Sequence, residues 1–308
     1  MKITLIIPSY RRPQDLERCL GAIQQQFRPV DELIVVMRDT DAQTWEFIKH
    51  YDAGLLPLRM VTVVEPGVIA AMNLGLANAN GDIVVFTDDD AVAHPDWLAK
   101  LEQHYQADMK IGGVGGRDCV YLNGKLLDIQ HSVVGQVKWF GKVIGNHHAG
   151  SGAAREVDVL KGVNMSFRQA AIDGELFDPS MKGSGAQIHF EIEFCLRVKK
   201  SGWKILYDPS LQVDHYPSQR FDEDQREGFH PLATANLAHN ETVALLKHLS
   251  PIRRIVFMLW ACIVGHRGSF GLIQLLRFLP RDGLIAWQKY CSSMRGRWQG
   301  LSSWSHSR

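Results

Sequence analysis

Gly81-Asp-Ile-Val-Val-Phe-Thr-Asp-Asp-Asp90 is the stretch of the chain that decides its fold. Residues 83–87 form a short apolar run rich in β-branched side chains, which predicts a buried strand. Three consecutive carboxylates, Asp88, Asp89 and Asp90, follow this run directly. The stretch therefore predicts a strand that crosses the core and ends in a cluster of acids.

Comparable apolar runs precede this strand, and helical patterns separate them. Strands are predicted at residues 2–7, 32–37 and 58–64, and helices at 14–26, 44–51, 68–79 and 95–105. Strands that alternate with helices form right-handed βαβ units, so we expect an α/β fold with a mostly parallel, Rossmann-like sheet and helices on both faces. Ligands bind such sheets at the carboxyl ends of the strands, where residues 10–12, 38–41, 65–67 and 88–90 are expected to meet.

The pattern is less regular after the glycine-rich run Gly112-Gly-Val-Gly-Gly116. This run lies in mid-domain and does not join a first strand to its helix, so it indicates close backbone packing and not a phosphate-binding loop. Residues 117–160 are polar, and we expect them to form a long excursion beside the ligand site. A helix is predicted over 188–200, short strands over 203–207 and 211–213, a linker over 218–230 and further helices from residue 234.

Adjacent carboxylates after a buried strand repel one another unless a cation neutralises them. Oxygen ligands of this kind suit Mg²⁺ or Mn²⁺, which would bridge to the phosphate oxygens of a substrate. His215 follows a short predicted strand, and its imidazole suits Mn²⁺. The alternative interpretations are a solvated acidic turn and a structural histidine.

Glu191 and Glu193 stand near the start of the helix predicted over 188–200. Acids in that position can simply complement the helix dipole. One of them could instead accept the proton of an incoming hydroxyl as a general base. Because residues two apart do not share a helix face, we expect only one of the two to point at a substrate.

The composition and the remaining motifs narrow the class of protein. The 308 residues are 45% hydrophobic and 22% charged, with a net charge of +1, which is typical of a globular protein and not of a polyanion binder. The chain contains no GxxxxGK[ST], HExxH or GxSxG motif, which argues against a P-loop nucleotide hydrolase, a zincin and an α/β-hydrolase.

The C-terminal residues 251–308 differ in charge from the rest of the chain. They contain nine Lys or Arg residues, a single acid (Asp282) and four of the eight tryptophans, with apolar stretches between the charges. This composition suits an interfacial helix on an anionic leaflet. The alternatives are a helical cap on the catalytic domain and a dimer interface, and the region is too apolar to favour nucleic acid.

Several of these segments, in this order, resemble the large inverting glycosyltransferase family 2. They are Ile3-Thr-Leu-Ile-Ile-Pro-Ser-Tyr-Arg-Arg-Pro13, Asp31-Glu-Leu-Ile-Val-Val36, the 81–90 stretch with Pro95-Asp-Trp-Leu98, Gly162-Val-Asn-Met-Ser-Phe-Arg168, and Glu193-Phe-Cys-Leu-Arg197 with the following residues up to His215. The resemblance covers residues 1–216 and implies the GT-A fold. It divides the chain into a GT-A domain over 1–230, with a nucleotide-sugar-binding half (1–116) and an acceptor-binding half (117–230), and a basic, Trp-rich helical region over 231–308.

The resemblance also implies roles for individual residues. Asp90 and His215 would bind the divalent metal, Mn²⁺ or Mg²⁺. Glu191 stands six residues before Arg197, where the family usually has its catalytic base, and Glu193 is the reserve candidate. Met37 occupies the position of the family's base-reading Asp, so Asp39 or Asp41 is expected to substitute and Arg38 to approach the diphosphate. The expected donor contacts are Pro8, Tyr10, Arg11, Arg38, Asp39, Asn73, Asp88 and Asp89.

The expected function is therefore inverting transfer of one sugar from a nucleoside-diphosphate sugar to a hydroxyl acceptor. The chain lacks the Gln-x-x-Arg-Trp signature of processive members. The acceptor is expected to be a glycan or lipid-linked glycan of surface polysaccharide synthesis. The alternatives are a non-catalytic scaffold that binds a nucleotide sugar or glycan, and a sugar nucleotidyltransferase, although residues 8–13 lack the glycines of the nucleotidyltransferase loop.

The expected location is the cytoplasm, with peripheral attachment to the inner face of the plasma membrane. The N-terminus lacks a signal-peptide pattern, and no run of 18 apolar residues predicts a spanning helix. Five scattered cysteines favour reduced thiols. The sequence does not indicate an oligomeric state.

Overall fold

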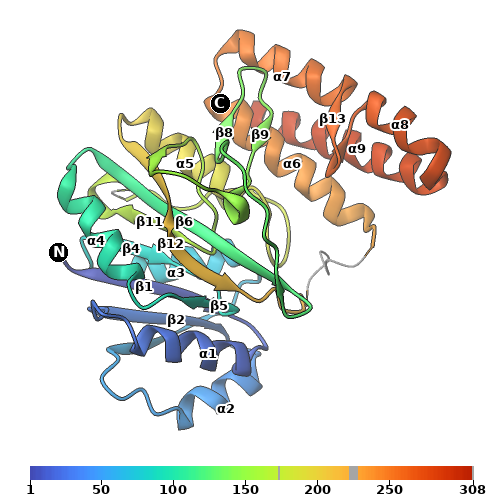
Figure 1. Cartoon of the computed structure of the whole chain (residues 1–308). Helices are drawn as coiled ribbons and strands as arrows, with labels where there is room; N and C mark the ends of the chain where they lie inside the picture. The colour runs from blue at the N-terminus through green and yellow to red at the C-terminus, as the bar shows by residue number, and fades with distance from the viewer. Residues whose placement is uncertain (173, 222–227, 307–308) are drawn as a thin grey trace.

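The four N-terminal apolar runs form the parallel half of one mixed sheet. They are β1 (Ile3–Ser9), β2 (Glu32–Arg38), β3 (Leu58–Val63) and β4 (Ile83–Phe86), and they lie in the order β3-β2-β1-β4. The computed structural model describes residues 1–172, 174–221 and 228–306 (Figure 1). Because the chain order reverses beside β1, the carboxyl ends of β1 and β4 flank the crevice where such sheets bind ligands.

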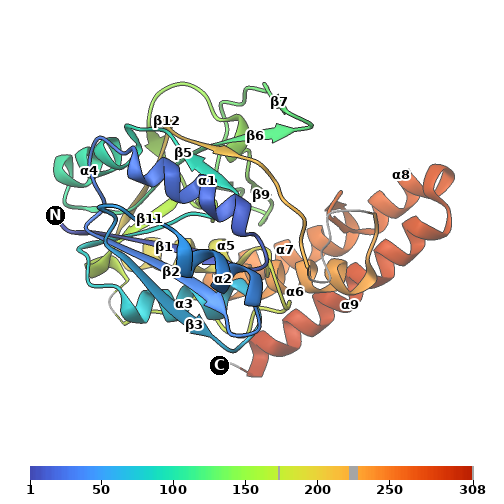
Figure 2. The same cartoon turned by 90° about the horizontal axis from the view of Figure 1, so that it is seen from below.

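Helices cover both faces of this half of the sheet, as the alternating pattern predicted. Helices α1 (Pro13–Gln24), α2 (Ala42–His50) and α4 (Trp97–Ala107) share one core with the odd-numbered positions of β1, such as Leu5. Helix α3 (Val68–Asn78) packs on the other face against Ile6. Figure 2 shows α1 and α3 on opposite sides of β1 and β2. Successive strand residues point to opposite faces, so both faces needed apolar side chains.

The second half of the sheet is mixed in direction. The antiparallel strand β11 (Met165–Arg168) joins β4 to β6 (Ile111–Leu122), and β6 pairs in parallel with β12 (Lys204–His215). The excursion expected from residue 117 begins later, because 117–122 continue β6 as a strand. The two short strands predicted near 205 and 212 are one strand whose register shifts between Asp208 and Gln212. The shorter elements are β5 (Ala91–Ala93), β7 (Lys125–Leu126), β8 (Gln136–Val137), β9 (Val143–Ile144), η1 (His147–Ala149), β10 (Arg155–Glu156) and η2 (Gln169–Ala171).

The glycine-rich run lies inside β6, where neighbouring chain leaves no space for side chains. A Cβ atom on Gly112 would lie 2.5 Å from Cβ of Trp203, and one on Gly116 would lie 1.9 Å from the carbonyl oxygen of Leu211. The prediction of close backbone packing is confirmed, since these glycines let β6 pass tightly beside β12.

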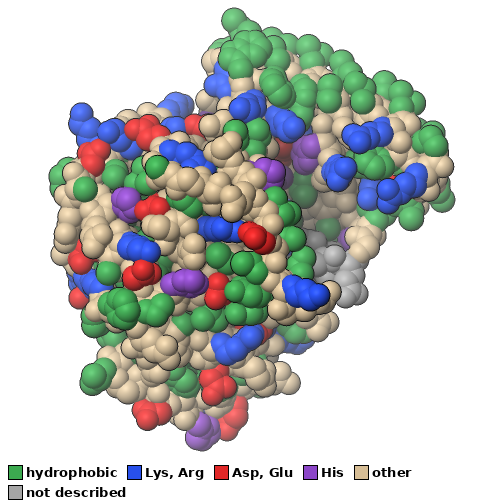
Figure 3. Space-filling view, in the orientation of Figure 1, with side chains coloured by type: hydrophobic (Ala, Val, Ile, Leu, Met, Phe, Trp, Pro, Cys, Tyr) green, Lys and Arg blue, Asp and Glu red, His purple; other side chains and the backbone are tan. Residues whose placement is uncertain are grey.

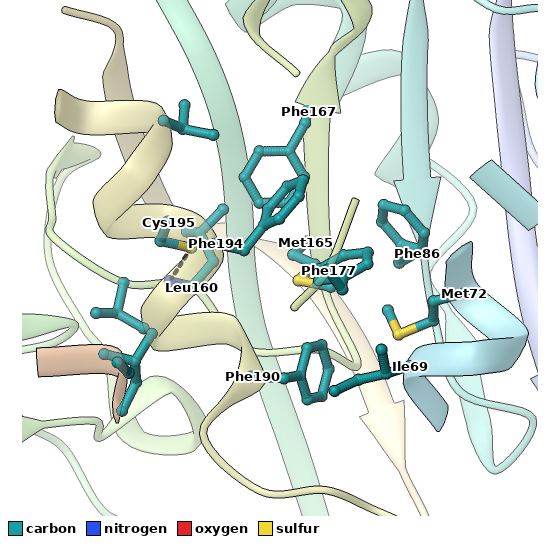
Figure 4. Close-up of a cluster of buried hydrophobic side chains, with 14 of the residues drawn as sticks. Ile69, Met72, Phe86, Leu160, Met165, Phe167, Phe177, Phe190, Phe194 and Cys195 are labelled. Atoms are coloured by element: carbon teal, nitrogen blue, oxygen red, sulfur yellow. Dashed lines mark hydrogen bonds between the residues drawn. The ribbon is translucent and has the colours of Figure 1, made fainter. Parts of the chain in front are cut away.

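An aromatic cluster fixes the start of α5 (Phe190–Lys200) against the sheet (Figure 4). Phe177 lies between Phe86 on β4 and Phe190 and Phe194 on α5, with ring centroids 4.1–5.4 Å apart. The Sγ atom of Cys195 accepts a hydrogen bond from the backbone N–H of Leu160 at 3.4 Å. Edge-to-face and stacked pairs of this kind stabilise a core beyond simple burial, so the first turn of α5 is held rigidly beside the crevice.

The C-terminal region is helical and packs on the catalytic domain, as one of the alternatives predicted. Its helices are α6 (Pro231–His248), α7 (Pro251–Ile263), α8 (Leu272–Asp282) and α9 (Leu284–His306), with the short hairpin β13 (Gly265–His266) and β14 (Ser269–Phe270). Leu245 of α6 and Phe257 of α7 are buried in the same core as α5. Within α6 and α9 the buried ion pair of Glu241 with Arg297, 2.6 Å apart, joins the two helices. Among the described helices, none combines the length and the apolar character needed to cross a bilayer.

Candidate active site

One cavity opens at the carboxyl ends of β1, β2 and β4, where the sequence predicted a crevice. Segments far apart in the chain meet there: the loop after β1, the acidic turn after β4, the residues before β11 and the start of α5. Its lining includes Pro8, Tyr10, Arg12, Arg38, Asp88, Asp89, Asp90, Lys161, Gly162, Glu191, Arg220 and Phe221.

The three carboxylates of the acidic turn have different surroundings. Asp89 accepts hydrogen bonds from Oγ of Ser9 at 2.8 Å and from the Arg12 guanidinium at 2.9 Å. Burial nevertheless raises the pKa of Asp89 to about 7, although Arg12 opposes the shift. Burial and the neighbouring Asp90 also raise the pKa of Asp88. Asp89 therefore joins the turn to the loop after β1, and Asp88 is half-buried and lines the cavity.

Asp90 lines the cavity and is paired with His215, which lies behind it. The Nε2 atom of His215 lies 3.3 Å from Oδ1 of Asp90, and the second Asp90 oxygen accepts the backbone N–H of Ser218 at 3.0 Å. Burial alone would raise the pKa of Asp90, but His215 and Arg12 lower it to about 2. Burial likewise opposes the charge on His215, whereas Asp118 and Asp90 raise its pKa to about 9.

The sheet brings these two residues together across the chain. β12 pairs with β5 so that His215 stands opposite Ala91, the residue after Asp90. The Nδ1 atom of His215 faces Asp118 of β6 at 3.8 Å. Asp118 was not foreseen from the sequence, because only the pairing of β6 with β12 places it there.

Asp88, Asp90 and His215 have the geometry of a metal site. One ligand atom from each lies within 4.8 Å of the others. Asp90 Oδ1 and both ring nitrogens of His215 are buried without a hydrogen-bond partner in the described part of the chain. Two carboxylates and an imidazole suit Mn²⁺ or Mg²⁺, and Asp118 is placed to orient the ring. The residues present therefore fit a divalent cation, which would satisfy Asp90 Oδ1 and one ring nitrogen of His215.

Glu191 and Glu193 face in different directions, as expected for residues two apart on a helix. Oε1 of Glu191 lies 3.4 Å from the backbone nitrogen of Gly162, which donates to it, and 3.9 Å from Nζ of Lys161. Glu193 is not among the described residues that line the cavity. Its carboxylate instead lies 3.2 Å from Arg197 and 3.1 Å from Nε2 of His248. Of the two acids, Glu191 has the access that a general base requires.

A sequence family model decides the identity of the chain. The model described as glycosyl transferase family 2 matches residues 4–159, which is half of the chain. The chain belongs to glycosyl transferase family 2. The match begins in β1 and includes the acidic turn, so the family assignment covers the strands that build the cavity.

Curated relatives of this glycosyltransferase differ in how much of their sequence aligns with the chain. Glycosyltransferase AglE of Haloferax volcanii is 29% identical over 74% of the chain and 70% of AglE. Glucosyl-dolichyl phosphate glucuronosyltransferase of the same organism is 23% identical over 70% of the chain and 69% of that protein. Glycosyltransferase GlyA of Streptococcus pneumoniae is 31% identical over 36% of the chain, and the aligned part spans only 16% of GlyA.

Solved structures show that this enzyme has the GT-A fold. S. aureus TarS (residues 1–349), solved with UDP-GlcNAc, superposes with a TM-score of 0.60 at 15% identity over 100% of this chain and 93% of TarS. The mannosyltransferase PcManGT from Pyrobaculum calidifontis, solved with GDP-Man and Mn²⁺, superposes with a TM-score of 0.57 at 16% identity over 98% and 87% of the two chains.

The donor contacts expected in this glycosyltransferase are only partly brought together. Pro8, Tyr10, Arg38, Asp88 and Asp89 line the cavity. The guanidinium of Arg38 lies 5.6 Å from the centre of the Tyr10 ring, and its buried Nε atom has no hydrogen-bond partner among the described residues. A flat ring beside an unsatisfied donor suits a nucleotide base or its phosphates.

Arg11, Asp39 and Asn73 do not appear in the cavity lining that the structure describes. Arg11 has a left-handed backbone (φ 58°), and its guanidinium lies over Tyr10 and Phe221, so Arg12 is the arginine that reaches the acids. The side-chain amide of Asn73 donates a hydrogen bond to the carbonyl oxygen of Phe177 at 2.9 Å and accepts one from the Phe177 N–H at 2.8 Å.

The two acids considered as substitutes at the end of β2 also have local roles. Asp39 lies 3.9 Å from the Nε atom of Arg38. Asp41 caps α2 by accepting the Thr44 N–H and also accepts the Arg11 N–H. Both oxygens of the Asp41 carboxylate therefore already accept hydrogen bonds from backbone N–H groups of this chain.

The sequence places Arg12 at the crevice without a role of its own, and it predicts no role for Lys161, Phe221 or Asp118, which lie in or behind the cavity. Arg12 directly follows Arg11, an expected donor contact, and Lys161 directly precedes the Gly162–Arg168 segment that resembles the family. Phe221 lies in the stretch predicted as a linker, of which residues 222–227 are outside the described part of the structure. No pattern in that stretch predicts a contact with the cavity.

Proposed function

We propose that this family 2 enzyme is an inverting, non-processive glycosyltransferase that transfers one sugar from a nucleoside-diphosphate sugar to a hydroxyl acceptor. The observation that supports it best is the meeting of Glu191 with the Asp88–Asp90 turn in one cavity. A general base and a cation site that share one cavity are what in-line displacement of a diphosphate requires.

In the proposed reaction the Glu191 carboxylate takes the proton of the acceptor hydroxyl. The hydroxyl oxygen forms its bond to the anomeric carbon while the bond from that carbon to the diphosphate oxygen breaks on the opposite face, which inverts the configuration. The cation held by Asp88, Asp90 and His215 would neutralise the negative charge that develops on the leaving diphosphate. Glu191 is fixed for this task by the rigid first turn of α5 and by the Gly162 N–H.

We assign residues 1–116 to donor binding and residues 117–230 to the acceptor, with 231–308 as a helical addition. Tyr10 and Arg38 would hold the nucleotide, and Arg12 balances the acidic turn through Asp89 and Asp90. Lys161, 3.9 Å from Glu191, would contact a phosphate oxygen or the acceptor. Mn²⁺ is favoured over Mg²⁺ because the site includes an imidazole and because PcManGT was solved with Mn²⁺.

We further propose that the acceptor is a lipid-linked glycan of surface polysaccharide synthesis, met at the inner face of the plasma membrane. The support is the name of one relative, which acts on glucosyl-dolichyl phosphate, and the basic, apolar composition of residues 251–308. A scaffold that binds a nucleotide sugar without turnover is the competing function, because Met37 replaces the expected acid.

The test of this function is the thermal stability of the chain with UDP, GDP, dTDP and CMP sugars, each with and without Mn²⁺. A donor at 100 times its Kd stabilises the folded state by ~2.7 kcal/mol, which is an easily measured shift. We expect one nucleotide to stabilise the protein in a Mn²⁺-dependent manner and to be consumed on incubation. Binding without consumption, with every hydroxyl acceptor tried, would favour the scaffold.

A further inference from the structure

The outward face of α7 is aliphatic from end to end. Ile252, Ile255, Leu259 and Ile263 are 49–69% exposed. At about 100° per residue these four positions share one side of the helix, opposite the buried Phe257. A surface helix normally presents polar side chains on the side that faces away from the core, so this helix has a second apolar face that the catalytic domain does not cover.

The apolar surface continues onto α8 and the start of α9. Leu272, Ile273, Leu276 and Leu279 of α8 are 43–60% exposed, and Leu284, Ile285 and Trp287 follow at the α8–α9 turn, 49–69% exposed. Figure 3 shows hydrophobic side chains gathered along the edge of the molecule formed by α7 and α8. We call these eleven residues the apolar edge. A contiguous apolar surface of this kind marks an interaction site.

Positively charged side chains beside the apolar edge indicate which kind of partner it fits. Arg277 and Arg281 are exposed on α8, next to the aliphatic face, and Arg267 and Arg295 are exposed nearby in sequence. Asp282 is the single acid in residues 251–308, and it is paired with Arg281 at 3.3 Å. Apolar side chains bordered by arginines complement an anionic lipid surface, where the aliphatic groups enter the headgroup region and the arginines meet phosphates.

A second copy of the chain fits this surface less well. In a two-fold symmetric dimer the same patch meets itself, which would bring Arg277 and Arg281 of both copies close together, with Asp282 as the single acid that residues 251–308 of each copy supply to balance them.

We propose that the apolar edge is the surface by which this protein docks, without spanning, on an anionic phospholipid leaflet. The proposal rests on the proposed function only in so far as docking would bring the cavity near a lipid-linked acceptor. The contact itself involves none of the residues that line the cavity.

The test is sedimentation of the full chain with vesicles of phosphatidylcholine alone and of phosphatidylcholine mixed with phosphatidylglycerol, at low and at high salt. We expect the chain to bind the mixed vesicles, and to bind more weakly at high salt because salt screens the arginines. Ile255→Glu with Leu259→Glu should lower the binding constant by at least about tenfold, since each side chain loses its burial in the interface. Arg277→Gln should lower it about fivefold on anionic vesicles, from the roughly 1 kcal/mol that one basic residue contributes.

Leu55→Glu is the matched control. Leu55 is fully exposed in the segment between α2 and β3, and Figure 1 places α2 at the end of the molecule remote from α7. This variant should bind vesicles like the parent. Failure of the parent to bind anionic vesicles, or equal binding by the α7 variant, would overturn the proposal. So would a parent dimer that ignores vesicles and that the α7 variant makes monomeric.

The donor-dependent thermal shift, measured on the same proteins, keeps this result separate from the proposed function. A folded α7 variant that keeps the donor shift and loses vesicle binding supports the docking surface. A parent that binds vesicles but shows neither a donor shift nor turnover contradicts the enzyme mechanism and leaves the docking surface standing.

Discussion

Replacement of Glu191 by glutamine is expected to lower the rate of sugar transfer by ~10²–10⁴-fold, the usual contribution of a general base. Glutamine keeps the shape of the side chain and can still accept the Gly162 N–H, but it cannot take the acceptor proton. Binding of the donor should change little, because the base acts on the acceptor. Turnover, measured with the donor identified by thermal stability, and donor affinity are the two readouts.

Glu193→Gln is the control, because it makes the same change two residues away on the same helix. Its carboxylate faces Arg197 and His248, so the expected loss is in stability, on the order of 2 kcal/mol for charge-assisted hydrogen bonds, with turnover of the folded protein nearly unchanged. If Glu193→Gln loses transfer and Glu191→Gln does not, the assignment of the base is reversed.

Asp90→Asn is expected to abolish the Mn²⁺-dependent part of donor binding and to lower transfer by ~10²–10³-fold, the equivalent of the several kcal/mol that a Lewis-acid metal contributes. The carboxylate of Asp90 is held ionised, since its pKa is lowered to about 2, so the substitution removes a full negative charge from the site. Asparagine can still accept the Ser218 N–H, which limits the structural change.

Asp82→Asn provides the comparison for this variant. Asp82 stands directly before β4, at the opposite end of the strand that leads to the acidic turn, and its carboxylate accepts a hydrogen bond from the Lys2 N–H at 2.7 Å. It should bind donor and Mn²⁺ like the parent. If the Asp90→Asn protein is still stabilised by donor in a Mn²⁺-dependent manner, as strongly as the parent is, the cation binds at a site that does not include Asp90.

Much of the fold of residues 1–116 could be predicted because local patterns determine it. The apolar runs of β1, β2 and β4 and the acids after β4 are sufficient to place Asp88–Asp90 at the crevice, since the carboxyl ends of neighbouring parallel strands meet. The periodicity of α5 also showed that Glu191 and Glu193 must diverge.

The remaining features depend on contacts that no local pattern reveals. Arg12 rather than Arg11 reaches the acids because Arg11 has a left-handed backbone, and the sequence Tyr-Arg-Arg does not signal that conformation. His215 meets Asp90 because β12 pairs with β5, and it meets Asp118 because β12 pairs with β6. The apolar edge could be predicted as composition but not as a surface, because which side of α7 is covered depends on the packing of Phe257 against the catalytic domain.

The anomeric configuration of the product tests the central mechanism most directly. With water in place of the acceptor, proton NMR can record the released sugar before its anomers equilibrate in solution, and with a hydroxyl acceptor it records the configuration of the new glycosidic bond. Inverting transfer predicts the anomer opposite to that of the donor, because the acceptor oxygen attacks the face opposite the diphosphate. Release of the donor's own anomer would contradict single displacement assisted by Glu191 and would require a different mechanism in the same cavity.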